Sequence, residues 1–82
     1  MYNIIFSNKF RRQLKKLDKE FQRRVLKILE RTRLRPHSYF QRLVGKKTYR
    51  LRVGNYRIIA DIEGEHLVIL ILEIGHRKNI YN

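Results

Sequence analysis

Residues 49–62, YRLRVGNYRIIADI, carry the strongest structural signal in the chain. Apolar and polar side chains alternate on both sides of Gly54-Asn55, and a Gly-Asn pair between two alternating runs is typical of a two-residue β-hairpin turn. Such a turn sets Arg52 opposite Arg57, and residues that pair across two strands point to the same side of the sheet. The stretch therefore predicts an antiparallel hairpin with one apolar face and one basic face.

The segments around the hairpin predict the remaining strands. A second turn is expected near Glu63-Gly64-Glu65, and residues 67–72, LVILIL, are apolar on both faces, as in a central strand. Gly75 is expected to end that strand. At the other end of the chain, residues 2–6 alternate and predict one more short strand.

Between the first strand and the hairpin, the hydrophobic period becomes helical. Ser7 and Asp18 are the predicted N-caps of two helices, each with an apolar stripe opposite lysines and arginines. Pro36 is expected to end the second helix, because proline disfavours helical backbone in the residue before it. We expect Phe40 and Leu43 to hold the following loop on the core.

The predicted order of elements is β-α-α-β-β-β. This order indicates an α+β fold in which a helical hairpin packs on one face of a small antiparallel sheet. With 82 residues, of which 43% are hydrophobic, the chain is long enough for one modest core. We therefore predict a single domain over residues 1–82.

Charge is the dominant feature of the composition. Twenty lysines and arginines against seven acidic residues give a formal net charge of +13. Such a domain is attracted to polyanions, so nucleic acid is the leading class of partner, ahead of an acidic protein or an anionic membrane surface. No apolar run approaches a membrane span, no signal peptide is recognised, and the absence of cysteine suits a reducing compartment. We expect a cytoplasmic protein with no membrane association.

The basic side of the hairpin has two explanations. Arg50, Arg52 and Arg57 fall on the side that the helices are not expected to cover, and directly opposed like charges destabilise a strand pair. They form either a solvated face or a phosphate clamp, because guanidinium groups bind phosphate oxygens bidentately. The basic residues of 9–35 are explained more simply as the polar surface of the helices, although they could also follow a nucleic-acid backbone.

The chain ends with GHRKNIYN, residues 75–82, so that His76, Arg77 and Tyr81 follow the last predicted strand. These residues form either a solvated tail or part of a reactive site. No second histidine or carboxylate is recognised at metal-ligand spacing, and neither a Ser/His/Asp arrangement nor a glycine-rich phosphate loop is present. The sequence therefore predicts no metal and no cofactor.

These segments together resemble the RelE/ParE superfamily of bacterial and archaeal toxin–antitoxin toxins. The likeness rests on YRLRVGNYRIIADI, the apolar strand after it and IGHRKNIY, with YNIIFSNKFRRQLKKLDKE and RLVGKKTYR before them. It covers nearly the whole chain, and the Gly-His-Arg…Tyr ending is closer to the RelE branch. The resemblance implies a RelE-like, microbial-RNase-like fold and a ribosome-dependent endoribonuclease that cleaves mRNA in the ribosomal A site. It also implies that an acidic, RelB-like antitoxin wraps around the toxin and silences it.

The resemblance further implies roles for particular residues. It assigns substrate binding to Arg50 and Arg52, and catalysis to Arg57, Arg77 and Tyr81. The best-studied relatives have lysines where Arg50 and Arg52 stand. Because arginine binds phosphate well but transfers protons poorly, these two positions are expected to bind the substrate rather than to exchange protons with it.

The implied reaction uses a nucleophile that RNA itself supplies. A 2′-OH attacks the adjacent phosphorus and leaves a 2′,3′-cyclic phosphate and a 5′-OH, so the enzyme must align the backbone, stabilise negative charge and move two protons. Tyr81 is the expected general base, because neighbouring guanidinium groups favour a phenolate. Arg77 would stabilise the leaving oxygen, and His76 is an alternative acid. Two other classes stay open, a ParE-like DNA gyrase inhibitor and a non-catalytic RNA-binding module, in which Arg77 and Tyr81 would have no chemical role.

Overall fold

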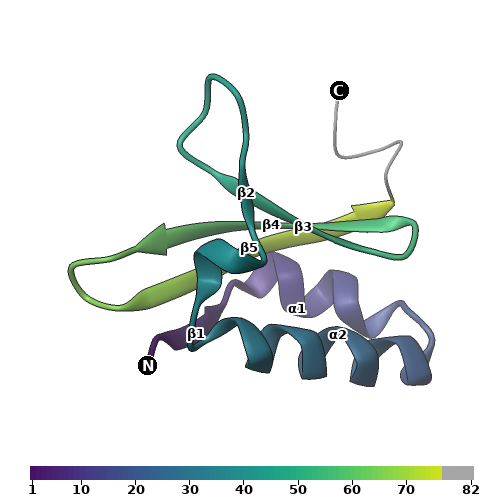
Figure 1. The fold of residues 1–82 in the computed structure, drawn as a ribbon. Helices are drawn as coiled ribbons and strands as arrows, with labels where there is room; N and C mark the ends of the chain where they lie inside the picture. Colours follow the sequence, from purple (N-terminus) through teal and green to yellow (C-terminus); the bar gives the residue numbers. More distant parts are fainter. Residues whose placement is uncertain (77–82) are drawn as a thin grey trace.

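The computed structural model describes residues 1–76 of the chain, and its strands form one five-stranded sheet in the order β1-β5-β4-β3-β2. Two helices pack against one face of this sheet (Figure 1). The elements in chain order are β1 (Asn3–Phe6), α1 (Asn8–Lys15), α2 (Lys19–Thr32), the short 3-10 helix η1 (Pro36–Ser38), β2 (Gln41–Arg42), β3 (Tyr49–Val53), β4 (Tyr56–Glu63) and β5 (Val68–His76). The predicted fold class is therefore confirmed.

The predicted hairpin is confirmed together with its register. Strands β3 and β4 are joined by Gly54-Asn55, and Arg52 lies directly opposite Arg57, as Arg50 lies opposite Ile59. Gly54 has a φ of +59°, in the left-handed region that glycine enters without steric strain. Apart from Ile59, which pairs with Arg50, the apolar side chains of the hairpin face the helices, and its arginines lie on the face that the helices leave uncovered.

The prediction of an antiparallel sheet was wrong for β1, which joins the sheet in parallel and makes it mixed. Asn3 pairs with Val68 and Phe6 with Ile71, both in parallel register, while β4 pairs with β5 in antiparallel register. The alternation within a strand indicates its faces but not the direction of its partner, which depends on the segments that connect the two. The predicted end of the last strand was wrong by one residue, since Gly75 still pairs with β4 and the strand continues to His76.

Both predicted helix caps are confirmed. The backbone N–H of Phe10 donates to Ser7 Oγ at 3.0 Å, and that of Phe21 donates to Asp18 Oδ2 at 3.4 Å. The Ser7 hydroxyl also donates to the carbonyl oxygen of Leu72 at 2.7 Å, which ties the start of α1 to β5. A serine that satisfies an orphan N–H of the helix therefore also fixes the position of that helix on the sheet.

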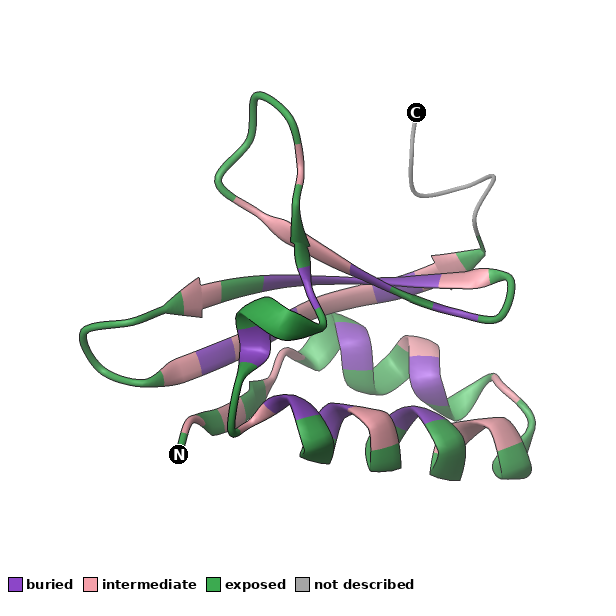
Figure 2. Ribbon diagram, in the orientation of Figure 1, coloured by how far each residue is buried: buried purple, intermediate pink, exposed green. Residues whose placement is uncertain are grey.

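The core lies between the helices and the sheet, and Figure 2 shows buried residues along their facing sides. The ring of Phe10 stacks on that of Phe6 with 5.3 Å between centroids. Phe40 is buried in the core, as predicted. The prediction for Leu43 was wrong: it is half-buried and lies outside the core cluster, because the chain leaves the sheet there and forms a projecting loop. We call this loop, residues 43–48 between β2 and β3, the arm.

Helix α1 covers the part of β5 that extends beyond β1. The backbone N–H of Ile74 donates to Gln13 Oε1 at 2.8 Å, and Lys9 forms an ion pair with Glu73 at 3.2 Å. These contacts hold the end of β5, where Gly75 pairs with Arg57, so the helices also help to position the basic face. No helix within residues 1–76 is both long and apolar enough to cross a membrane.

Candidate nucleic-acid interface

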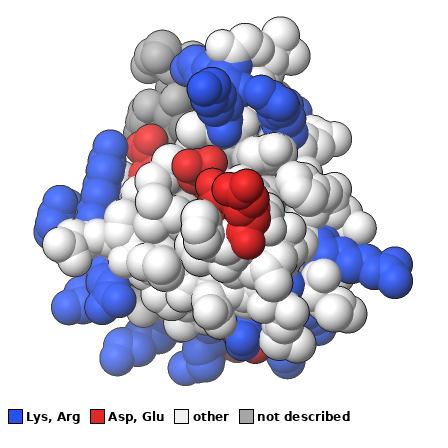
Figure 3. All heavy atoms as spheres, turned by 90° about the vertical axis from the view of Figure 1, so that its left-hand side faces the viewer, with Lys and Arg blue, Asp and Glu red and all other residues white. Residues whose placement is uncertain are grey.

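Acidic and basic side chains are unevenly distributed over the described surface. Figure 3, viewed from the side of the β4–β5 turn, shows acidic side chains gathered there, with lysines and arginines above and below them. Glu63 and Glu65 belong to this turn and are exposed. An anionic ligand is therefore attracted to the other parts of the uncovered face, where the arginines lie.

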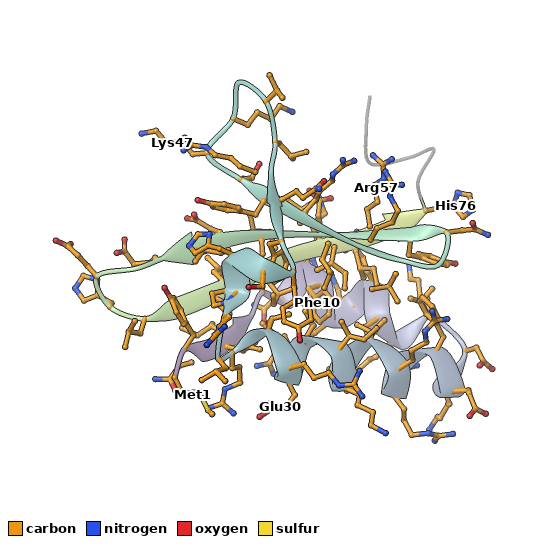
Figure 4. The ribbon with its side chains drawn as sticks, viewed as in Figure 1. Met1, Phe10, Glu30, Lys47, Arg57 and His76 are labelled. Carbon is orange, nitrogen blue, oxygen red and sulfur yellow. The ribbon has the colours of Figure 1, made fainter. Side chains whose placement is uncertain are left out.

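The structure brings Arg50, Arg52 and Arg57 together on the uncovered face, and we call this group the arginine face. Arg52 and Arg57 are directly paired across β3 and β4, and Arg50 is half-buried and donates to Gln41 Oε1 at 3.1 Å. Figure 4 shows the side chain of Arg57 rising from β4 on the side opposite the helices. This arrangement matches the placement that the alternation of the hairpin predicted.

The three arginines differ in exposure. Arg57 is only 6% exposed, whereas Arg52 is exposed. Arginines are rarely buried to this extent, because removing a guanidinium from water costs free energy. Arg57 is therefore not a freely solvated side chain, whereas Arg52 can be one.

Two neighbouring hollows run along the arginine face. One has a volume of about 460 Å³ and lies between the arm and the floor formed by Arg50 and Arg57. The other, of about 530 Å³, is lined by Arg50 and Arg52 together with residues 37–41, around η1 and β2. Arg50 borders both hollows, so the two lie next to each other on the basic face.

Of the predicted acid–base residues, the structure describes only His76, because Arg77 and Tyr81 lie outside the described residues. His76 pairs with Tyr56 in the ladder, and their rings meet edge-on with 5.6 Å between centroids. Since paired residues share a side of the sheet, His76 lies on the side of Tyr56, and the side chain of Arg57 points to the other side. The register does not bring His76 into the arginine face.

The basic residues of the arm and of β2 were not among the site residues predicted from the sequence. Arg42 and Lys46 line the first hollow, and Lys47 follows Lys46 on the exposed arm. The only local sign of them was the run Gly45-Lys46-Lys47, which has no periodicity. What gives these residues a place at the interface is the antiparallel pairing of Gln41–Arg42 with β3, and two residues are too few to show a strand pattern.

The structure also brings together three possible metal ligands, which the sequence did not indicate as a metal site. Glu63, Glu65 and His66 bring their ligand atoms within 4.8 Å of one another at the β4–β5 turn. All three side chains are exposed, and Glu63 Oε1 already accepts a hydrogen bond from the backbone N–H of Glu65 at 2.9 Å. We assign no metal to this turn, because its local hydrogen bond accounts for the grouping of the carboxylates.

The pairing of Arg52 with Arg57 leads to a prediction about stability. Within residues 1–76 no hydrogen bond or ion pair of the Arg52 side chain is found, and Glu73 on β5 is paired with Lys9. Arg52→Thr removes the repulsion and keeps a good strand former, so we expect stability equal to that of the wild type or higher by up to about 1 kcal/mol. The gain should shrink in high salt, where charges are screened.

The measurement is the urea midpoint of Arg52→Thr at low and high salt. Arg52→Lys is the control, because it keeps the charge at the same strand position and should show no gain. A clear loss of stability in Arg52→Thr at low salt would mean that Arg52 has a structural partner, and the repulsion argument would be wrong.

Comparisons with known proteins agree with this fold. The family model described as the ParE toxin of type II toxin–antitoxin systems, parDE, matches residues 4–81. Toxin RelG of Mycobacterium tuberculosis is 34% identical to the chain over 85 residues, covering 98% of this chain and 95% of that protein. Toxin RelE3 of Methanocaldococcus jannaschii is 31% identical, covering 96% and 94%. The archaeal RelE–RelB complex from Pyrococcus horikoshii contains a chain that superposes with a TM-score of 0.82 at 26% identity, covering 95% of this chain and 97% of that one.

Proposed function

Because the chain belongs to the RelE/ParE family of type II toxin–antitoxin toxins, we propose that it is a ribosome-dependent endoribonuclease that cleaves mRNA in the A site and so inhibits translation. The observation that carries this proposal is the opposed pair Arg52–Arg57, with Arg50 beside it, on the uncovered face. Three guanidinium groups placed together fit an RNA backbone, since arginine binds phosphate through paired donors.

In this proposal, the arginine face holds the RNA and stabilises the transition state. Arg57, the least exposed of the three, faces the scissile phosphate, because a partly desolvated charge acts more strongly on developing negative charge than an exposed one. Arg52 shares that phosphate across the hairpin. Arg50, held by Gln41, binds the neighbouring phosphate between the two hollows.

The proton transfers are assigned to residues at the end of the chain. The 2′-OH loses its proton to a Tyr81 phenolate, and its oxygen forms a bond to phosphorus as the bond from phosphorus to the 5′-oxygen breaks. The leaving 5′-oxygen is stabilised by Arg77 and receives a proton from it, since the register places His76, the alternative acid, on the other side of the sheet. The products are a 2′,3′-cyclic phosphate and a 5′-OH, so the step consumes no water.

The ribosome enters this proposal as the source of alignment. Neither arginine nor tyrosine is an efficient proton carrier near neutral pH, so catalysis depends strongly on holding the 2′-oxygen in line with the leaving oxygen. Correct orientation of reacting groups is worth about 7–11 kcal/mol in favourable systems. We therefore expect free RNA to be a poor substrate and mRNA fixed in the A site to be a good one.

Primer extension on mRNA in a translation reaction tests the proposed function directly. With the protein present, sharp stops in phase with codons are expected, and they should be absent when ribosomes are omitted. The match to the ParE toxin family model favours one second candidate, a ParE-like inhibitor of DNA gyrase. Intact mRNA together with cleaved DNA or a supercoiling defect would support that candidate and contradict the RNase.

The same proposal predicts an acidic, RelB-like antitoxin in the cytoplasm. A chain with a charge of +13 favours an acidic partner, and exposed apolar side chains such as Ile5 and Leu67, at 50% and 43% exposure, offer area for a segment that folds on binding. Pull-down from the native host should recover a small acidic protein, and adding that protein should stop cleavage. Recovery of nucleic acid without any protein would contradict a toxin–antitoxin role.

A further inference from the structure

The arm is a defined structure and not a loose connection. The backbone N–H of Leu43 donates to the carbonyl oxygen of Thr48 at 2.9 Å, and that of Lys46 donates back to Leu43 at 3.2 Å. Gly45 turns the chain with a φ of +75°, and Arg42 Nε donates to the carbonyl oxygen of Lys46 at 3.4 Å. These bonds describe a turned backbone, which holds the two ends of the arm together.

The arm stands on the uncovered side of the sheet and forms one wall of a basic groove. Figure 1 shows the loop between β2 and β3 rising away from the helices. The groove of about 460 Å³ at its base has Arg42 and Lys46 on the side of the arm and Arg50 and Arg57 as its floor. It is lined by cations on both sides, which is the arrangement expected around a polyanion.

The arm also offers an apolar contact above this groove. Val44, which lines the groove, is 99% exposed and lies between Arg42 and Lys46 in the sequence. A single-stranded nucleic acid matches this combination, because its phosphates follow cations while its unpaired bases and riboses remain available for apolar contact. A duplex would present its phosphates but keep its bases stacked inside.

The acidic end of the sheet limits the direction of such a strand. Glu63 and Glu65 lie at the β4–β5 turn, and Figure 3 shows acidic side chains there, below a group of basic ones. Phosphates are repelled from that turn and attracted to the arm and the arginine face. The favourable path therefore runs from the arm across Arg50 and Arg57 and avoids the β4–β5 turn.

We propose that the arm binds single-stranded RNA next to the scissile phosphate, with Lys46 and Lys47 on flanking phosphates and Val44 against an unpaired nucleotide. The inference rests on the proposed function in one respect, namely that Arg57 holds the scissile phosphate. It adds a second binding element, which fixes the register of the strand relative to that phosphate. The arm is thus a substrate-positioning element, and the arginine face is the site of charge stabilisation.

The test is a binding measurement on free RNA with a matched control. The probe is a fluorescently labelled six-nucleotide RNA with 2′-O-methyl riboses, which cannot supply the attacking hydroxyl. Lys46→Ala/Lys47→Ala should weaken binding at least fivefold, and the slope of log K against log salt should fall by about 1.4, since each phosphate contact on a single strand contributes about 0.7. Lys15→Ala/Lys16→Ala removes an equally adjacent, exposed lysine pair from the end of α1 and should change affinity less than twofold.

The binding and cleavage results together distinguish a specific RNA contact of the arm from general attraction and from protein docking. Equal losses in the two double variants, with urea midpoints unchanged, would show general electrostatic attraction and overturn the inference. A double variant of the arm that binds RNA normally but no longer binds the antitoxin would mark the arm as a protein-docking surface and also overturn it. If wild-type protein fails to cleave mRNA on ribosomes while the arm variant still loses RNA affinity, the proposed function fails and the arm remains an RNA contact.

Discussion

Arg57→Ala is expected to lower ribosome-dependent mRNA cleavage at least tenfold, which corresponds to about 1.4 kcal/mol of activation free energy. The reason is placement: Arg57 is 6% exposed, lies opposite Arg52 and forms the floor of the groove below the arm. A charge with little access to water stabilises an oxyanionic transition state more than a solvated charge does. Arg57→Lys should recover part of the rate, because the charge returns without the two-donor fork.

The cleavage rate is read from the growth of codon-phased stops in primer extension, with the urea midpoint measured on the same samples. Arg23→Ala is the control, since the side chain of Arg23 is 72% exposed on α2 and far less buried than that of Arg57. Cleavage by Arg57→Ala at the wild-type rate would mean that the arginine face is a solvated surface without a phosphate-binding role.

The same assay extends to the two residues outside the described part of the chain. Arg77→Ala and Tyr81→Phe should each lower cleavage at least tenfold without changing the urea midpoint, because the proposed mechanism uses them for proton transfer and leaving-group stabilisation. Loss of the phenol oxygen removes the general base and leaves the ring. Wild-type cleavage by Tyr81→Phe would show that this assignment is wrong, while Arg57 could still bind the phosphate.

The largest expected effect on stability is that of Phe10→Ala, which should lower the free energy of unfolding by about 3–5 kcal/mol. Phe10 is 1% exposed, stacks on Phe6 and places α1 against the sheet, so its removal leaves a cavity between the two layers. Small domains are stable by only about 5–15 kcal/mol, so much of the total would be lost.

Urea denaturation of Phe10→Ala and of a control variant, both in an Arg57→Ala background, measures this loss while cleavage in the expression host is at least tenfold lower. Leu34→Ala is the matched control: Leu34 is 66% exposed, and its truncation should change stability by no more than about 0.5 kcal/mol. Equal effects of the two substitutions would show that α1 does not contribute to the core through Phe10.

The sequence predicted those features that depend on close neighbours in the chain. The Gly54-Asn55 turn fixes the register that sets Arg52 opposite Arg57, and the structure has the same pairs. The caps at Ser7 and Asp18 are likewise local, since each side chain accepts a hydrogen bond from the backbone three residues further on. A period of two or 3.6 residues and the chemistry of a turn are properties of short segments, so they can be derived from the sequence alone.

Other features were decided by contacts between distant segments. The parallel pairing of β1 with β5 and the bond from Ser7 to Leu72, 65 residues away, depend on how the whole chain packs. So does the difference between a nearly buried Arg57 and an exposed Arg52, which the alternation of the hairpin treats as equivalent. The tertiary structure also determines that His76 lies beside Tyr56 and that the arm lies beside Arg50 and Arg57. Local periodicity tells which side of a strand a residue occupies, but its burial and its neighbours across a groove depend on the elements packed around it.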